Sequence, residues 1–336
     1  MTLLFTRSDI LRSLEIPAVL DALRSGFGAI ADIDPLRVRT GLPGPGTATA
    51  LLPGLMPGIP AYTVKVNAKF PGATPALRGV VCLHDLTDGT LLALLDSSTI
   101  TAWRTGLAAA LATDVLASAG TPEGTGGVGR GDRTAVQAEQ PDQRRTRGVA
   151  VGVVGAGAQA AMVLAGLTAL RRVDRLVVQD VAPARAAEFL AGQGIPGVVV
   201  NDPRAVAAAA DVVVLATWSR EPLLTAADAR PGLHLTTLGA DEPGKVELDA
   251  GLLSAARVVV DDRALAVQMG ALGNVGLGAD AAVTLTDVLT GAVAGRRSAE
   301  EITVYAPVGL PWQDLAIAWT VYQAASGHVR TIDFLS

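Results

Sequence analysis

The second half of the chain alternates short apolar runs with helical segments. The apolar runs are 149–155, 175–180, 197–200, 211–217, 233–239 and 256–262. Strands this apolar are covered on both faces, and strands separated by helices pair in parallel. The pattern predicts an α/β fold with a Rossmann-type, doubly wound parallel sheet.

A glycine fingerprint stands in the turn after the first of these runs. In VGVVGAGAQA, Gly155, Gly157 and Ala160 fit G-x-G-x-x-G/A between a strand and a helix. Gly155 allows the tight turn, and Gly157 lets the backbone approach a pyrophosphate. The first helical residues, Ala158 and Gln159, direct free N–H groups at the phosphates. We predict a dinucleotide site; the alternative is that the glycines serve packing only.

Three polar residues at later strand ends extend this prediction. Asp180 ends the next strand, where a carboxylate binds the ribose 2′-hydroxyl and repels a 2′-phosphate. NAD(H) is therefore favoured, although the nearby Arg185 leaves NADP(H) open. Thr217 and Ser219 follow the run 211–217 at the carboxyl edge, where such sheets bind ligands. Ordinary polar loop residues are the alternative for this last pair.

The first 120 residues show a different pattern of predicted helices and strands. Apolar residues at helical spacing predict a helix over 16–30, and Gly- and Pro-rich sequence follows to about Pro60. Strand-like runs at 62–70, 79–86 and 90–96 suggest an antiparallel sheet, followed by a helix over 99–119. A last helix over 311–326 lies beyond the parallel unit. Residues 121–148 contain no Leu, Ile, Met or aromatic residue, which predicts a mobile insertion.

Composition excludes several classes of function. The net charge is −5, so nucleic-acid binding is not expected. Cys82 is the only cysteine, placed in an apolar run that predicts a buried strand position, and the three histidines lack metal-ligand spacing, so we expect no metal. The uncharged stretch 148–170 is interrupted by the glycine turn and Gln159, and the N-terminus lacks a signal-peptide pattern. We expect a soluble cytoplasmic protein with no membrane contact.

Several motifs in order resemble the ornithine cyclodeaminase/μ-crystallin family. They are YTVKVNAKFPG, DGTLLALLDSSTITAWRTGLAAALAT, VGVVGAGAQA, LATWS, LGADEPGKVELD and VGLPWQDLAIAWTVYQAA. The resemblance implies an α+β substrate-binding and dimerisation domain (1–120 plus 305–336), a Rossmann domain (149–304) and a homodimer. It also implies hydride transfer between a nicotinamide and the α-carbon of an amino or imino acid.

The resemblance assigns roles to individual residues. Lys65 matches the lysine at the substrate carboxylate and reacting carbon, and Asp241 matches the catalytic aspartate that exchanges the proton on nitrogen. Arg104 of the RTG motif matches a carboxylate-binding arginine, and the adjacent Thr105 is implied on the cofactor side. Arg39 is our choice for the second carboxylate arginine; Arg37, two residues away, is the alternative.

Departures from the family pattern narrow the substrate. Ornithine cyclodeaminase carries an acidic residue where Ala50 stands, and no Asp or Glu occurs between Thr40 and Ala68. An unpaired distal ammonium is costly to bury, which favours a small apolar or cyclic substrate. Changes at 79–80 and at 306–307 lie near the nicotinamide in the family, and Gly106, which gives RTG for the commoner RTA, adds a little space. We expect an NAD(P)H-dependent imine reductase or amino-acid dehydrogenase; ornithine cyclodeaminase and a non-catalytic crystallin-like binding protein are the alternatives.

Overall fold

The computed structural model describes residues 1–29, 36–44, 46–70, 72–118, 148–325, 329–334 and 336. The chain divides into two compact units, Met1–Ala108 with Gly309–Ser336, and Ala109–Val308. Helix α3 (Ser97–Leu116) begins in the first unit and ends in the second. The predicted mobile insertion falls, apart from Gly148, outside the described residues.

The first unit is built on a seven-stranded mixed sheet of order β15-β1-β6-β5-β4-β3-β2. Its strands are β1 (Thr2–Phe5), β2 (Leu36–Gly41), β3 (Thr47–Gly54), β4 (Ala61–Lys69), β5 (Leu77–Asp85), β6 (Leu91–Asp96) and β15 (Arg330–Ile332). Strands β4, β5 and β6 pair antiparallel, as predicted, while β1 pairs parallel with β6. Helices α1 (Arg7–Ser13), α2 (Ile16–Gly28) and α12 (Pro311–Gln323) belong to this unit.

Four strands of this sheet were not predicted: the short strands β1 and β15, and the strands β2 and β3. The segment described above as Gly- and Pro-rich sequence contains β2 and β3, which pair antiparallel from Leu36↔Leu52 to Gly41↔Thr47. Strand β2 lies at the sheet edge and is mostly exposed, so it lacks the apolar run that marks a buried strand. The alternation of apolar and polar residues in LRVRT was the signal that could have predicted β2.

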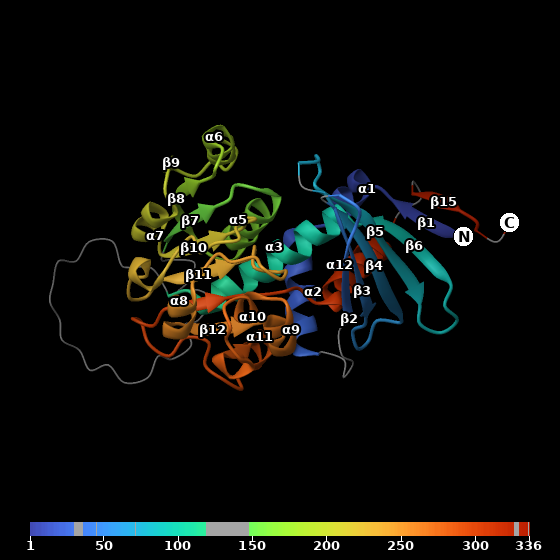
Figure 1. Cartoon of the computed structure of the whole chain (residues 1–336). Coiled ribbons are helices and arrows are strands. Elements are labelled where there is room, and N and C mark those ends of the chain that lie inside the picture. Colours follow the sequence, from blue (N-terminus) through green and yellow to red (C-terminus); the bar gives the residue numbers. More distant parts are fainter. Residues whose placement is uncertain (30–35, 45, 71, 119–147, 326–328, 335) are drawn as a thin grey trace. The chain divides into compact units, whose positions relative to one another are not determined.

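The pleat of this sheet separates two faces. Arg37, Leu51, Lys65 and Val81 are register partners across four strands, so their side chains lie on one face. Helix α12 packs against β3, β4 and β5 and against α2 (Figure 1). Leu51, Lys65 and Val81 are buried on this face.

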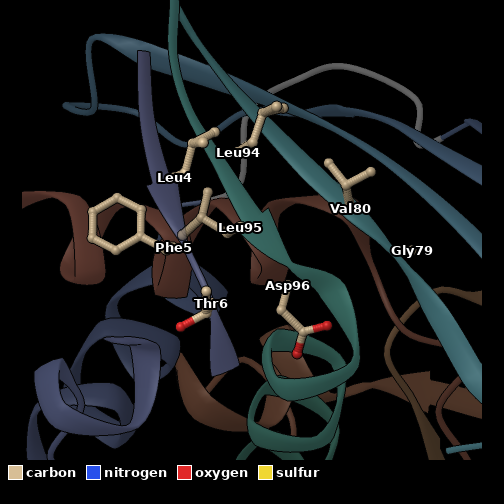
Figure 2. Close-up of a pocket in the computed structure, with 8 residues that line it drawn as sticks. All are labelled: Leu4, Phe5, Thr6, Gly79, Val80, Leu94, Leu95 and Asp96. Atoms are coloured by element: carbon tan, nitrogen blue, oxygen red, sulfur yellow. The ribbon is translucent and has the colours of Figure 1, made fainter. Parts of the chain in front are cut away.

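The opposite face is apolar and only half-buried. Val64, Cys82, Leu94 and Leu4 form one row on it. A cavity of about 300 Å³ opens at its edge. Figure 2 shows Leu4, Leu94 and Val80 projecting from neighbouring strands at this cavity. Cys82 is therefore a strand residue, as predicted, but it is not fully buried.

The second unit contains an eight-stranded parallel sheet of order β13-β12-β14-β11-β10-β7-β8-β9. The strands are β7 (Val149–Val154), β8 (Val173–Gln179), β9 (Gly197–Val199), β10 (Val212–Leu215), β11 (His234–Thr237), β12 (Arg257–Val260), β13 (Ala282–Thr284) and β14 (Thr303–Tyr305). The order reverses between β7 and β10, which is the switch point of a doubly wound sheet. This confirms the predicted fold class.

Helices cover both faces of the parallel sheet (Figure 1). They are α5 (Ala158–Leu170), α6 (Pro183–Ala191), α7 (Pro203–Ala209), α8 (Ala250–Ala255), α9 (Arg263–Gln268), α10 (Ala271–Asn274) and α11 (Leu285–Leu289), with short 3-10 turns η1 (Ala226–Asp228) and η2 (Ala279–Ala281). The core between them is formed by strand residues such as Val154, Val213 and Leu235. Within the described ranges, no helix is both long and apolar enough to cross a membrane.

Candidate active site

A buried group of charges lies on the helix-covered face of the first unit. The side chain of Lys65 is 1% exposed, and its Nζ donates to Asp314 Oδ1 at 2.8 Å and lies 2.7 Å from Oδ2. Nζ also lies 3.4 Å from the Thr101 hydroxyl on α3. The Nε of Arg104, which is also buried, is 3.5 Å from Asp314 Oδ1. The structure therefore brings together the two cations that the sequence nominated.

The charge state of Lys65 follows from these surroundings. Burial lowers its pKa to about 7; the Asp314 carboxylate opposes this shift, while the charges of Arg104 and Arg37 add to it. An amine of this pKa exchanges protons near neutral pH and can bind a carboxylate or polarise a C=N bond.

Sequence reasoning missed two residues of this group. Asp314 and Gln313 lie in the first turns of α12, and both are buried. The Gln313 side-chain oxygen accepts from Arg104 Nη1 at 3.3 Å and from the Leu310 N–H at 3.2 Å. A charged residue inside the apolar run PWQDLAIAW was the signal that could have pointed to Asp314.

The backbone around Arg104 leaves little room. Gly309 has φ +94°, and a Cβ atom there would collide with the Arg104 guanidinium. A side chain at 309 would thus both strain the backbone and displace the arginine.

The two candidate arginines of β2 lie on the Lys65 face but differ in burial. Arg37 is a register partner of Leu51 and hence of Lys65, is half-buried, and acts electrostatically on Lys65. Arg39 lies one row away and is exposed. The geometry thus associates Arg37, rather than our first choice Arg39, with the Lys65 group.

Ala50 does not lie where the substrate argument placed it. It pairs with Val66, so its side chain is on the face opposite Lys65. Thr49 and Leu51 are the β3 residues on the Lys65 face. Ala50 therefore does not replace an acidic residue beside Lys65. The sequence still contains no Asp or Glu between Thr40 and Ala68.

In the second unit the glycine fingerprint has the predicted strand–turn–helix geometry. Gly155 has φ +89°, and a Cβ there would lie 2.6 Å from the Ala216 carbonyl oxygen. Gly157 is the N-cap of α5, without a side-chain cap, and nothing lies within 4 Å of a Cβ built on it. The first N–H groups of α5, at Ala158 and Gln159, have no acceptor within the helix, as an anion site requires.

Asp180 lies beside this turn and is already hydrogen-bonded. Its carboxylate accepts from the N–H of Ala156 at 2.9 Å and of Ala182 at 2.8 Å. It also accepts from Arg185 Nε at 2.9 Å and Nη2 at 2.5 Å. Although burial opposes it, these bonds lower the pKa of Asp180, which keeps the carboxylate charged. The residues present fit a dinucleotide, and Asp180 lies at the strand end where a ribose acceptor is expected.

Glu247, whose role was not predicted, connects the loops after β10 and β11. Its carboxylate accepts from the Thr217 N–H and hydroxyl at 2.7 and 2.6 Å. It also accepts from the Thr237 hydroxyl at 2.7 Å and the Gly239 N–H at 2.9 Å. Burial raises the pKa of Glu247, although these hydrogen bonds partly oppose the shift. Thr217 is thereby fixed, and its hydroxyl accepts from the Ser219 N–H at 3.2 Å.

Asp241 lies in the loop after β11. Its Oδ1 is 3.0 Å from Lys245 Nζ, and Lys245 lies over the half-exposed Trp218 ring at 5.0 Å. Asn274 holds this loop through hydrogen bonds to the carbonyls of Glu242 and Lys245. A paired carboxylate on a braced loop at the carboxyl edge of a parallel sheet can exchange a proton with a ligand.

Thr105, the remaining predicted residue, follows Arg104 on α3 in the first unit. Its hydroxyl oxygen is buried. In the part of the chain that the structure describes, there is no cluster of three His, Cys, Asp or Glu side chains able to hold a metal ion.

The fold and these residues define a two-unit α/β protein with a Rossmann-type dinucleotide site and, in the other unit, a buried cation cluster. The chain belongs to the ornithine cyclodeaminase/mu-crystallin family, whose model matches residues 143–328.

Named relatives include reductases and dehydrogenases. Alanine dehydrogenase of Archaeoglobus fulgidus is 31% identical over 75% of this chain and 71% of its own length. Delta(1)-pyrroline-2-carboxylate reductase of Paracoccus denitrificans is 28% identical over 92% of both chains. Among solved structures, an archaeal alanine dehydrogenase dimer with bound NAD superposes with a TM-score of 0.83 at 26% identity, covering 99% of both chains.

Proposed function

We propose that this protein is an NAD(P)H-dependent oxidoreductase that transfers hydride between a nicotinamide and the α-carbon of a small apolar or cyclic imino or amino acid. The observation that carries the proposal is the burial of Lys65 and Arg104 together, with Asp314 as the carboxylate that pairs with both. Among the described residues of this group, one carboxylate faces two cationic side chains, so while Lys65 is protonated the group keeps a positive charge that a carboxylic-acid substrate neutralises.

The cofactor assignment rests on the second unit. Gly155 makes the tight turn, Gly157 leaves open space for a pyrophosphate, the start of α5 supplies N–H groups, and Asp180 supplies a ribose acceptor. The cofactor, when bound, supplies the hydride. NAD(H) is favoured because a 2′-phosphate would meet the Asp180 carboxylate; the related alanine dehydrogenase structure with NAD supports the same choice.

The first unit binds the substrate carboxylate. The planar guanidinium of Arg104 can hold a carboxylate by two parallel bonds. Lys65 donates to the same carboxylate or to the C=N nitrogen, and Arg37 adds positive charge on the same sheet face. Arg39 remains a weaker candidate because it is exposed.

Asp241 gives or takes the proton on nitrogen. The ammonium of Lys245 lies beside this side chain, and in the amine-to-imine direction the Asp241 carboxylate accepts the proton. In the reductive direction it must first take a proton from solvent.

Leu51 and Thr49 are the β3 residues on the Lys65 face, and neither carries the negative charge needed for an ion pair with a distal ammonium. This supports an apolar or cyclic side chain, as in the pyrroline-2-carboxylate reductase that the chain resembles. Ornithine cyclodeaminase activity, the alternative, requires a partner for that ammonium.

A substrate screen tests the proposal. Loss of NADH is followed over cyclic 2-imino acids and over 2-oxo acids with ammonia, with release of proline and ammonia from ornithine assayed in parallel. Lys65→Met serves as the inactive control. NADH-dependent reduction of at least one imino acid, abolished in Lys65→Met, is expected. Ornithine deamination without net NADH loss would instead identify the cyclodeaminase, and binding without turnover of any compound the crystallin-like protein.

The half-buried apolar face of the first sheet is the surface on which we place a second copy of the chain. Val64, Cys82 and Leu94 line it, and Val66 is 49% exposed. An apolar sheet face of this kind is typical of a subunit interface. A homodimer in light scattering, converted to monomer by Val66→Asp, is expected; a wild-type monomer would contradict it.

A further inference from the structure

Asp314 is a fully buried carboxylate in a helix whose buried side chains are mostly apolar. It is 0% exposed, and its neighbours Leu315, Ala316 and Ile317 are buried as well. A carboxylate at this depth is costly unless it is paired, because both its charge and its lone pairs lose water. The chain therefore retains it against a cost in stability.

Its pairing partners are the two cations assigned to the substrate carboxylate. One oxygen, Oδ1, accepts from Lys65 Nζ at 2.8 Å and lies 3.5 Å from Arg104 Nε. The other, Oδ2, lies 2.7 Å from Lys65 Nζ. The three side chains come from β4, α3 and α12, so Asp314 pairs with both cations from a third element.

The charge of Asp314 also raises the pKa of Lys65, whereas its other charged neighbours and its burial lower it. Burial, Arg104 and Arg37 all disfavour the ammonium form of Lys65, and Asp314 favours it both by its charge and by its hydrogen bond. Thr101, the other group within reach, is uncharged. Removing the negative charge alone would thus leave Lys65 neutral at a lower pH.

We propose that Asp314 is a positioning residue that holds Lys65 and Arg104 in place for the substrate carboxylate and sets the upper end of the pH range in which that carboxylate binds. This inference rests on the proposed function only in taking the Lys65–Arg104 group as the carboxylate site. Asp314 itself does not touch the substrate.

Binding of pyrrole-2-carboxylate, a planar carboxylate with no reducible C=N bond, tests the proposal without turnover. Its affinity for the full chain, measured by calorimetry across pH, should fall as Lys65 loses its proton. In Asp314→Asn, which keeps the shape and removes the charge, this fall should move to lower pH by about 1 to 3 units, the scale of a lost close charge partner. In a Lys65→Met background the same substitution should produce no such shift.

Asp314→Glu separates charge from placement. It keeps the charge but displaces the carboxylate, so the pH of the fall should stay near that of the wild type while affinity weakens about tenfold or more. Asp314→Glu also tests the positioning role if Asp314→Asn does not fold. Unchanged affinity in Asp314→Glu would overturn that role. An unshifted profile in a folded Asp314→Asn would overturn the charge role.

Asp114→Asn is the matched control. Asp114 is buried and pairs with Arg171 at 2.9 Å in the second unit, so its loss removes a comparable ion pair outside the site. It should leave the pH profile of carboxylate binding unchanged. Wild-type protein that binds pyrrole-2-carboxylate with the expected profile but reduces no imino acid would refute the proposed function and leave the Asp314 inference standing.

Discussion

The Lys245 ammonium lies 3.0 Å from Oδ1 of Asp241, and both residues stand on one loop that Asn274 holds to α10. Lys245 is buried while Asp241 keeps a partly exposed carboxylate, 24% accessible. The pair thus places a buried ammonium beside a carboxylate that solvent partly reaches.

Asp241→Asn should therefore remove proton exchange and keep the shape of the loop. Turnover should drop by roughly a hundredfold or more, the usual scale for a lost general acid or base, while NADH affinity barely changes. Steady-state kinetics with the best substrate and NADH fluorescence titration measure the two effects. Asp249→Asn is the control, because Asp249 only caps α8 and Asn caps equally well. Near-normal turnover in Asp241→Asn would make Asp241 a turn residue only.

Arg104→Lys should weaken substrate binding before it slows turnover. A point charge replaces the planar fork, and the contact with Gln313 is lost. We expect KM for the carboxylate substrate to rise by about tenfold or more with a smaller change in kcat. Arg39→Lys is the comparison: because Arg39 is exposed, its effect on KM should be small. Equal effects of the two would restore Arg39 as the second carboxylate arginine.

The Asp180–Arg185 pair should decide between NADH and NADPH. The wild type should bind NADH more tightly, since Asp180 repels a 2′-phosphate. In Asp180→Ser the Arg185 guanidinium, 55% exposed and no longer neutralised, becomes a phosphate partner. NADPH affinity should then rise roughly tenfold to a hundredfold, and Arg185→Gln should remove this gain. Fluorescence titration of both cofactors measures this; tighter NADPH binding by the wild type would mean that Arg185 already dominates.

His234 should make the protein sensitive to mild acid. It is fully buried between the Thr303 and Thr236 hydroxyls, and burial together with the charges of Arg296 and Arg171 holds its pKa well below 6.5. The unfolded chain therefore binds a proton below pH 6.5 that the folded chain does not, so stability falls as pH falls. The slope contributed is about 1.4 kcal/mol per pH unit.

Urea unfolding between pH 7 and pH 5 measures this slope. His234→Gln removes the titrating group and should show a shallower loss of stability over the same range. Identical slopes for the two proteins would show that other groups account for the acid sensitivity.

The sequence predicted the second unit well because its signals are local. Apolar runs alternate with helices, and the glycines stand in one turn, so neighbouring residues suffice to infer the sheet and the dinucleotide site. The Lys65 group is different. Lys65 and Asp314 are 249 positions apart, and the sequence around either residue does not predict a contact with the other. Lys65 and Arg104 were found only through the family resemblance.

The choice between Arg37 and Arg39 shows a further limit. Both residues lie on the same face of β2, so alternation cannot separate them, and the cross-strand register decides which one aligns with Lys65. The prediction that Ala50 lies at the substrate was wrong for the same reason, because neighbouring residues of β3 point to opposite faces of the sheet.

Gly309 constrains how the substrate range of this chain can be changed. The residue need not contact any ligand, yet every substitution there would push on the guanidinium of Arg104. A mutant library aimed at new substrates should hold position 309 fixed and vary Thr49 and Leu51, whose side chains share the sheet face of Lys65. Inactive variants at 309 would otherwise be mistaken for evidence of a substrate contact.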